Sequence, residues 1–198
     1  MFSTSQKIGV LGGGQLGKML CLAAGEWDFQ LYILDKSPEY PAGKVCAGFT
    51  SGDFKNYDDV LAFGLDKDIL TIEIEHVNTD ALRELERLGK TVHPSPAALD
   101  IIKDKGAQKE FYRDHNIPTT RFELFSSERD LKEAVQAGRW RFPFVQKTRT
   151  AGYDGRGVAV LREPADLDSK LLPGACLAEE MALIRTELAV IAARNASG

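Results

Sequence analysis

Residues 7–35 constrain the fold of this chain more than any other segment. Residues 7–11 form a short apolar run that predicts a strand, and this run leads directly into Gly12-Gly13-Gly14-Gln15-Leu16-Gly17. Residues 18–25 have a helix-forming composition, and residues 30–34 form a second apolar run that Asp35 closes. A strand, a glycine-rich turn, a helix and a second strand in this order predict a βαβ unit and therefore a parallel sheet.

The glycines of this turn leave three interpretations open. Gly12, Gly14 and Gly17 have the spacing of the dinucleotide-binding fingerprint, and Asp35 follows at about the expected distance. This pattern favours a nicotinamide-dependent dehydrogenase when it is taken alone. The same glycines also let the backbone approach a phosphate of any other ligand at the start of the helix. A tight turn with close helix packing and no ligand is the third interpretation.

A second glycine-rich segment lies between two further predicted strands, at residues 142–145 and 158–161. It contains Lys147 and the string Ala151-Gly152-Tyr153-Asp154-Gly155-Arg156-Gly157. A strand on each side predicts a hairpin, whereas a P-loop needs its glycines to open a helix. Such a hairpin is free to fold over a nucleotide, and Lys147 can pair with a phosphate as a point charge. An ordinary surface hairpin, in which glycine relieves turn strain, is the alternative.

Bulk composition indicates a soluble globular protein with one or two domains. The chain has 198 residues, 43% of them hydrophobic and 27% charged, and a formal net charge of -4, which argues against a nucleic-acid binder that relies on a diffuse basic surface. No apolar run approaches the length of a membrane span, and the first residues lack the features of a signal peptide. Cys21, Cys46 and Cys176 are widely spaced, as expected of buried thiols in a reducing compartment. We therefore expect a cytoplasmic protein that binds neither nucleic acid nor membranes.

The remaining pattern predicts two domains that divide at Pro94-Ser95-Pro96, at residues 1–95 and 96–198. Residues 69–77 alternate as a strand would, with Glu73 and Glu75 on one face and His76 on the other. A solvated edge strand explains that alternation as well as a ligand site does. The other expected elements are helices at 57–63, 78–88, 97–116 and 128–137 and strands at 91–93, 121–125, 176–178 and 189–193.

Together, these motifs resemble the ATP-grasp superfamily. The string Tyr153-Asp154-Gly155-Arg156-Gly157, together with Pro41-Ala42 and Asn116-Ile117-Pro118-Thr119, is similar to the 5-(carboxyamino)imidazole ribonucleotide synthase family within it. The resemblance implies an α/β fold: a Rossmann-like pre-ATP-grasp parallel sheet, followed by the first, incomplete part of an ATP-grasp domain. It also implies ATP-dependent carboxylation of 5-aminoimidazole ribonucleotide with bicarbonate through carboxyphosphate, a step of purine biosynthesis.

The resemblance also implies roles for particular residues. The catalytic residues would be Arg156, Asp154 and Tyr153. Arg156 would stabilise an anion, and Asp154 would orient Arg156 or contact the amine of the ribonucleotide. The ribonucleotide would contact Gly14, Gln15, Leu16, Glu73, Glu75 and His76. ATP would contact Lys105, Lys147, Gly152, Tyr153, Asp154, Gly155, Arg156, Gly157, Glu179, Glu180, Met181, Ala182 and Glu187.

Some features depart from the resemblance. The family's magnesium ligands lie further along than this chain extends, so ATP and Mg²⁺ are the implied cofactors but no residue here is assigned to the metal. Ala151 stands where a second glycine is usual, and Lys103 stands where glutamine is common. Another ATP-grasp carboxylase or ligase, or a fragment that binds ligands without catalysis, stays open beside the leading hypothesis. The dehydrogenase interpretation accounts for residues 7–35 but for none of the motifs after residue 100. Small molecules are the expected partners, and related enzymes suggest a homodimer.

Overall fold

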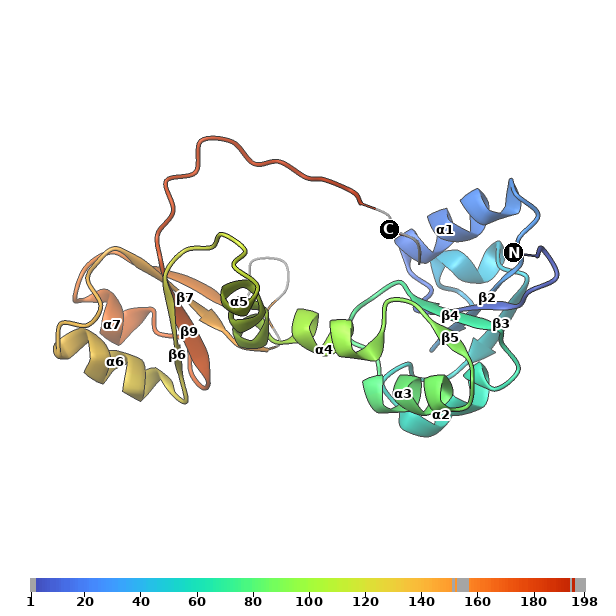
Figure 1. Ribbon diagram of the computed structural model, residues 1–198, viewed down its shortest axis with the longest axis horizontal. Coiled ribbons are helices and arrows are strands. Elements are labelled where there is room, and N and C mark those ends of the chain that lie inside the picture. The colour runs from blue at the N-terminus through green and yellow to red at the C-terminus, as the bar shows by residue number, and fades with distance from the viewer. Residues whose placement is uncertain (1–2, 151, 153–156, 193, 195–198) are drawn as a thin grey trace. The chain divides into compact units, whose positions relative to one another are not determined.

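The computed structural model describes residues 3–150, 152, 157–192 and 194 (Figure 1). The chain forms two compact units, residues 1–111 and 112–198, which divide within helix α5 (Lys105–Asp114). The expected domain division at residue 95 falls instead between the last strand of the first unit and helix α4. It stays a prediction, because compactness alone does not define where an independently folding domain begins.

The first unit is built on a parallel five-stranded sheet in the order β3-β2-β1-β4-β5. Its strands are β1 (Ile8–Leu11), β2 (Leu31–Asp35), β3 (Gly48–Ser51), β4 (Ile69–Ile72) and β5 (Thr91–Val92). The expected βαβ unit is confirmed, since β1 pairs in parallel with β2 on one side and with β4 on the other. The chain reverses its direction of growth at β1, so the carboxyl ends of β1 and β4 lie at the topological switch point, where open α/β sheets bind ligands.

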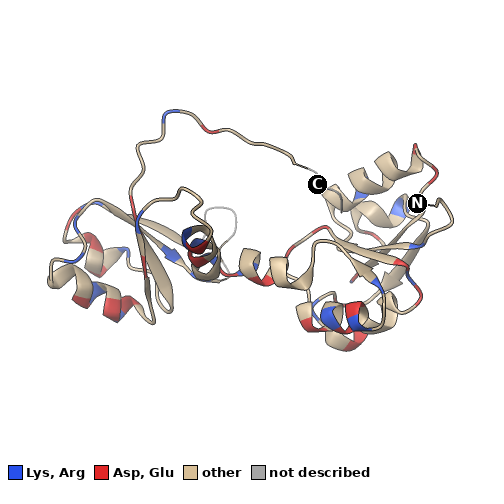
Figure 2. Cartoon of the chain, viewed as in Figure 1, with Lys and Arg blue, Asp and Glu red and all other residues tan. Residues whose placement is uncertain are grey.

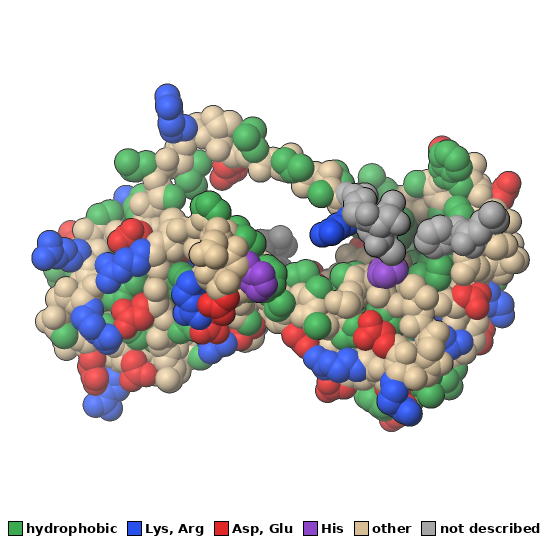
Figure 3. All heavy atoms as spheres, in the orientation of Figure 1, with side chains coloured by type: hydrophobic (Ala, Val, Ile, Leu, Met, Phe, Trp, Pro, Cys, Tyr) green, Lys and Arg blue, Asp and Glu red, His purple; other side chains and the backbone are tan. Residues whose placement is uncertain are grey.

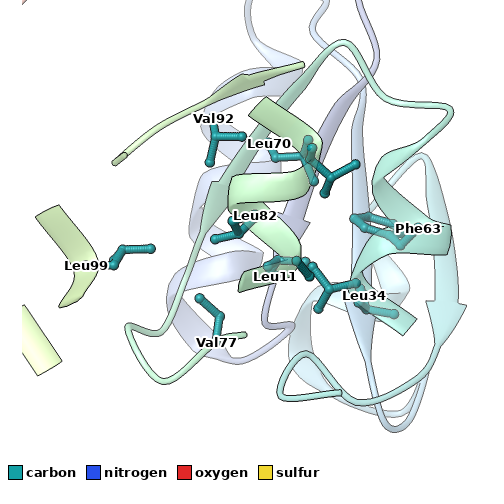
Figure 4. Packing of buried hydrophobic residues seen from close by; sticks show 11 residues of the cluster. Leu11, Leu34, Phe63, Leu70, Val77, Leu82, Val92 and Leu99 are labelled. Atoms are coloured by element: carbon teal, nitrogen blue, oxygen red, sulfur yellow. The ribbon is translucent and has the colours of Figure 1, made fainter. Parts of the chain in front are cut away.

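The sheet of the first unit connects to a set of short helices. They are α1 (Gln15–Gly25), a 3₁₀ turn at Pro41–Lys44, α2 (Tyr57–Gly64), α3 (Thr79–Arg87) and α4 (Pro96–Lys103). The expected start of α3 is confirmed: the Asn78 side chain accepts a hydrogen bond from the Ala81 amide at 2.9 Å. Leu82 and Leu85 of α3 are fully buried in one core cluster with Leu11 and Leu70 of the sheet, and Figure 4 labels Leu82, Leu11 and Leu70 within it.

The expected single helix over residues 97–116 is wrong, because the chain breaks at Asp104. Asp104 has extended backbone angles, with φ -120° and ψ 109°, between α4 and α5. Its Oδ1 accepts hydrogen bonds from the amides of Gly106 at 2.7 Å and Ala107 at 3.2 Å, so it caps the start of α5. Gly106 therefore lies in the first turn of a helix rather than in a helix interior, where glycine would cost about 1 kcal/mol.

The second unit contains an antiparallel four-stranded sheet in the order β6-β9-β7-β8. Its strands are β6 (Phe122–Phe125), β7 (Phe144–Thr148), β8 (Val158–Leu161) and β9 (Cys176–Glu180), and its helices are α6 (Glu128–Gln136) and α7 (Asp166–Ser169). The expected hairpin is confirmed, with Lys147 of β7 opposite Val158 of β8. Buried side chains of β7 and β9 form one core with α6 and α7. Figure 2 shows acidic and basic residues along α6.

Two expected strands are corrected by the structure. The strand predicted over 69–77 ends at Ile72, since its neighbours β1 and β5 end at Leu11 and Val92 and offer no further backbone to pair with. The strand predicted over 189–193 is absent from residues 189–192, where Ile191 is fully exposed. A strand needs a neighbouring strand for its backbone groups, and none lies beside this segment within the described residues. No helix among the described residues has the length and apolar character that a membrane crossing requires.

Candidate functional site

The glycine-rich turn joins β1 to α1 at the switch point of the parallel sheet. Gly12 has φ +108°, a conformation that residues with a side chain rarely adopt. Gly14 is the N-cap of α1 and makes no side-chain cap. A Cβ added to Gly17 would lie 3.0 Å from the Gly12 carbonyl oxygen, so glycine allows α1 to pack closely on the turn. The turn thus leaves room for a ligand or for another side chain above its backbone.

Asp35 holds this turn through one of its carboxylate oxygens and accepts a local hydrogen bond with the other. The Gly13 amide donates to Oδ2 at 2.7 Å and the Lys36 amide donates to Oδ1 at 2.7 Å. Asp35 is only 6% exposed. In a dinucleotide-binding protein the acid at this position binds the ribose hydroxyls of the cofactor. Here the same acid is committed to two backbone amides, which argues against the dehydrogenase interpretation.

Glu73 lies on top of the turn, directly after β4. A Cβ built on Gly12 would lie 2.7 Å from Glu73 Oε2, and one built on Gly14 would lie 2.7 Å from Glu73 Oε1. The Glu73 amide donates to the Leu11 carbonyl at 2.8 Å, which fixes the backbone beside β1. The sequence correctly placed Glu73 at the carboxyl edge of the sheet. Its carboxylate would repel a diphosphate that approached the start of α1, but it can accept a hydrogen bond from an amine or a hydroxyl.

A cavity of about 380 Å³ opens beside Glu73 and Gly14. It is lined by Gly14, Asp35, Lys36, Tyr40, Pro41, Asp53, Phe54, Lys55, Glu73 and Ile74. Lys36 Nζ lies 3.1 Å from Asp53 Oδ2. A hydrogen bond from the Lys55 amide, followed by the one from the Lys36 ammonium, holds the pKa of Asp53 below its ordinary value, while Asp53 raises the pKa of Lys36. The site therefore carries both negative and positive groups.

Sequence reasoning missed Lys36 and Lys55 as cavity residues. Lys36 could have been found, since it follows the acid at the end of β2 and the carboxyl ends of parallel strands share one edge of the sheet. Lys55 follows β3, a strand that the sequence pattern did not reveal. Its place in the cavity could therefore not be inferred before the topology was known.

The other residues assigned to the ribonucleotide lie near this turn in the chain but not all at the cavity. Gln15 and Leu16 form the exposed first turn of α1, and Leu16 is 63% exposed. Glu75 and His76 do not lie on opposite faces of a strand, as expected, because they follow β4 in a bend. His76 Nδ1 lies 3.2 Å from Glu75 Oε1, so these two residues contact each other. His76 lines a second cavity instead of the first.

In the second unit, Lys147 and Glu179 form an ion pair on the sheet face opposite the α6 and α7 core. Lys147 lies on β7 and Glu179 on β9, and Glu179 faces Val145 in the strand register, so Lys147 is its diagonal neighbour. The Glu179 side chain is 8% exposed and the Lys147 side chain is 31% exposed. The Thr120 hydroxyl also donates to Glu179 Oε2 at 3.2 Å. The pair therefore presents a held ammonium group on this face of the sheet.

The glycines at the base of the hairpin lie side by side. A Cβ added to Gly157 would lie 3.1 Å from the Gly152 Cα, and Gly157 has φ +78°. The Thr148 amide donates to the Gly157 carbonyl at 2.9 Å and so closes the hairpin. Tyr153, Asp154, Gly155 and Arg156, together with Ala151, lie outside the described residues.

The remaining candidate ATP residues lie in different elements. Lys105 is half-buried in the first turn of α5, in the first unit, where Asp104 caps the helix. Glu180 ends β9, and Met181, Ala182 and Glu187 follow it in an exposed segment without regular structure. The structure thus brings Lys147 and Glu179 together, and the roles of the other residues stay predictions.

The implied magnesium ion finds no ligand set in the part of the chain that the structure describes. Among those residues, no three His, Cys, Asp or Glu side chains converge as a metal site would require. Two of the candidate carboxylates are engaged otherwise: Asp35 binds backbone amides and Glu179 pairs with Lys147. We therefore assign no residue to the metal.

Comparison with known proteins identifies both parts of the chain. Residues 5–103 match the ribonucleotide synthetase preATP-grasp domain, and residues 110–198 match the ATP-grasp domain. A phosphoribosylaminoimidazole carboxylase from Candida glabrata is 34% identical over 98% of this chain and 35% of its own length. An N5-carboxyaminoimidazole ribonucleotide synthase from Pseudomonas aeruginosa is 33% identical over 97% of this chain and 53% of its own length.

A solved structure shares the fold of both units. It is the N5-carboxyaminoimidazole synthase from Aspergillus clavatus in complex with ADP and 5-aminoimidazole ribonucleotide, with a TM-score of 0.79, 30% identity and coverage of 92% of this chain and 48% of that chain. The present chain thus spans between about a third and a half of the length of these relatives. It belongs to the family of ribonucleotide synthetases in which a preATP-grasp domain precedes an ATP-grasp domain.

Proposed function

We propose that this chain provides the ribonucleotide site and part of the ATP site of an enzyme that carboxylates 5-aminoimidazole ribonucleotide. The reaction uses ATP and bicarbonate, proceeds through carboxyphosphate and yields 5-(carboxyamino)imidazole ribonucleotide in purine biosynthesis. The names of the relatives and the ligands of the Aspergillus clavatus structure support this assignment. The cytoplasmic location and the homodimer stay predictions.

The observation that carries the proposal is the position of Glu73 over Gly12 and Gly14. An anionic carboxylate above a glycine turn disfavours a diphosphate there and suits a ligand with hydrogen-bond donors, such as the amine of an aminoimidazole ring. Lys55 and Lys36, the latter paired with Asp53, line the same cavity and can contact a phosphate group. The cavity of about 380 Å³ falls in the range that small-molecule sites occupy.

In the second unit, Lys147 supports the binding of ATP phosphates. Transfer of a phosphoryl group depends mainly on positioning and on positive charge, which an ammonium group can supply. Glu179 holds Lys147 from the neighbouring strand, so we assign to Glu179 the positioning of Lys147 rather than a direct contact with the nucleotide. Lys105, Gly152, Gly157 and the hairpin residues keep the roles that the family resemblance implies.

The test measures ADP release from magnesium-ATP with bicarbonate, with and without 5-aminoimidazole ribonucleotide, on the 198-residue chain. Stimulation by the ribonucleotide is the result expected of a working enzyme. If the chain turns over no ATP, calorimetric titration with each ligand separates the remaining cases. Binding of both ligands, without turnover, would identify a ligand-binding portion of the enzyme, whereas binding of NAD in place of both would refute the proposal.

A matched pair of variants locates the ribonucleotide. Glu73→Gln should weaken its binding at least tenfold, since a charged hydrogen bond contributes about 1.5–3 kcal/mol. Glu26→Gln, an exposed residue at the end of α1, should leave binding unchanged. Another ATP-grasp carboxylase or ligase is favoured if ATP binds normally but the ribonucleotide does not.

A further inference from the structure

A second cavity, of about 370 Å³, lies in the first unit beyond the proposed ribonucleotide site. It is lined by Lys55, His76, Val77, Asn78, Thr79, Asp80 and Lys103. Lys55 also lines the first cavity, so the two cavities share one lysine. Figure 3 shows basic and acidic side chains interspersed over the visible surface. The lining of this cavity contains two lysines and one aspartate.

Lys103 reaches this cavity from the last turn of α4. Its Nζ donates to the Val77 carbonyl at 3.0 Å, which holds the ammonium group at the cavity wall. Lys103 is half-buried, and this burial lowers its pKa, while the nearby Asp80 opposes the shift. One carbonyl satisfies only one of the three donors of an ammonium group. The geometry therefore leaves Lys103 with capacity for an anion.

The backbone that carries Lys55 is fixed to Asn78, which also lines the cavity. The Asn78 amide donates to the Phe54 carbonyl at 2.9 Å, and Asn78 Nδ2 donates to the Lys55 carbonyl at 3.1 Å. The Lys55 amide donates to Asp53 Oδ1 at 2.9 Å. These bonds anchor the Lys55 backbone, and the residue lines both cavities.

The acidic groups near the cavity contact neighbouring side chains. Asp80 Oδ1 accepts a hydrogen bond from Arg83 at 2.7 Å, and Glu75 contacts His76 at 3.2 Å. These pairs reduce the repulsion that the two carboxylates would exert on an anion. Asp80 nevertheless keeps its charge at the cavity and should weaken anion binding to some degree.

We propose that this second cavity binds a phosphate group through Lys55 and Lys103. The phosphate can come from free phosphate in solution or from the phosphate group of a nucleotide that extends from the first cavity. The second source rests on the proposed function, whereas the site itself does not. Lys103, whose ammonium group is held by the Val77 carbonyl, and Lys55, whose backbone is held by Asn78, supply the positive charge that a phosphate requires.

The experiment titrates inorganic phosphate into the ¹⁵N-labelled 198-residue chain at constant ionic strength. Backbone amide shifts of residues 78–80 are followed, with those of residues 12–15 as a reference for the first cavity. We expect saturable shifts at 78–80. Lys103→Gln and, separately, Lys55→Gln should weaken phosphate binding at least fivefold. Lys44→Gln is the matched control, because Lys44 is exposed and lines neither cavity, and it should leave binding unchanged.

Asp80→Asn provides a change in the opposite direction. It removes a negative charge from the cavity wall, so phosphate should bind more tightly than in the wild-type chain. Three results would each overturn the proposal. They are the absence of saturable shifts at residues 78–80, a phosphate affinity of the Lys103→Gln and Lys55→Gln chains equal to that of the wild-type chain, and shifts confined to residues 12–15. The far-ultraviolet circular dichroism of each variant verifies that it is folded.

A second arm, with 5-aminoimidazole ribonucleotide, identifies the source of the phosphate. If the ribonucleotide displaces inorganic phosphate from residues 78–80, its own phosphate group occupies the cavity. If both bind together, the cavity takes free phosphate. A failure of the ribonucleotide to bind at all would count against the proposed function but would leave the phosphate titration of the wild-type chain intact.

Discussion

Replacing Lys147 by Met tests whether its ion pair with Glu179 is a structural contact as well as a candidate phosphate contact. The change removes the cation and leaves the Glu179 carboxylate, which is 8% exposed, with the Thr120 hydroxyl as a neighbour. Loss of one partner of a fully buried pair costs about 3–5 kcal/mol. Because the Lys147 side chain is 31% exposed, water can reach the site, and we expect a loss nearer to about 2 kcal/mol.

Glu179→Gln should cost less, about 1 kcal/mol, since the Lys147 ammonium can turn to solvent. In the double variant the two losses should not add, and the coupling energy should be about 1 kcal/mol. The surface pair of Lys132 with Asp168, at 2.6 Å, is the matched control in the same unit. Lys132→Met should cost well under 1 kcal/mol, because both partners are exposed.

Tryptophan fluorescence during urea unfolding provides the assay. The chain has two tryptophans, of which Trp140 is buried in the second unit and Trp27, in the first, is 73% exposed. In a Trp27→Phe background the fluorescence reports the second unit alone. A Lys147→Met loss no larger than that of Lys132→Met, or full additivity with Glu179→Gln, would refute the idea that Glu179 holds Lys147.

Two further predictions concern the glycine turn and the effect of pH. Gly14→Ala should weaken ribonucleotide binding at least tenfold, because the added Cβ would lie 2.7 Å from the Glu73 carboxylate and would displace it. Gly25→Ala, whose added Cβ has no neighbour within 4 Å, should bind the ribonucleotide normally in the same calorimetric titration. Equal losses of affinity in the two variants would contradict this prediction. The pKa of Asp166 is lowered, chiefly by the hydrogen bond from the Arg162 amide, so its carboxylate stabilises the fold above its ordinary pKa and this contribution disappears as pH falls through the lowered value. Urea unfolding should thus show Asp166→Asn less stable than the wild-type chain at pH 7, and the difference should shrink as the pH falls below the ordinary pKa of an aspartate. A difference that does not change with pH would argue against this prediction.

Local signals in the sequence were enough for the elements that carry the glycine turns. Residues 7–35 combine an apolar strand, glycines and a segment of helix-forming composition, and each signal depends on nearby residues alone. Asn78 predicted the start of α3 for the same reason, since a side-chain cap needs only a backbone amide three residues away. The hairpin at Lys147 followed from two apolar runs on either side of glycine.

Features that depend on distant partners could not be predicted in this way. Within the described part of the chain, the half-exposed edge strand β3 (Gly48–Ser51) pairs with β2 alone, and its short sequence has no clear apolar alternation. The end of β4 at Ile72 depends on the lengths of β1 and β5, not on its own composition. The cavity position of Lys55 depends on the pairing of β3 and on the place where β4 ends. The break at Asp104 is a local cap, but the periodicity of the flanking helices concealed it.

The most informative residue of the site is Asp35, because the same sequence fingerprint permits two opposite arrangements of its carboxylate. When the acid after the second strand is free, it can bind ribose hydroxyls and the glycine turn can accept a diphosphate. In this chain Asp35 accepts hydrogen bonds from the Gly13 and Lys36 amides and is buried, while Glu73 takes the space above the turn. The glycines here therefore accommodate a carboxylate, and the spacing of glycines alone cannot distinguish this arrangement from a dinucleotide site. The two arrangements differ in whether backbone amides occupy the carboxylate of this acid.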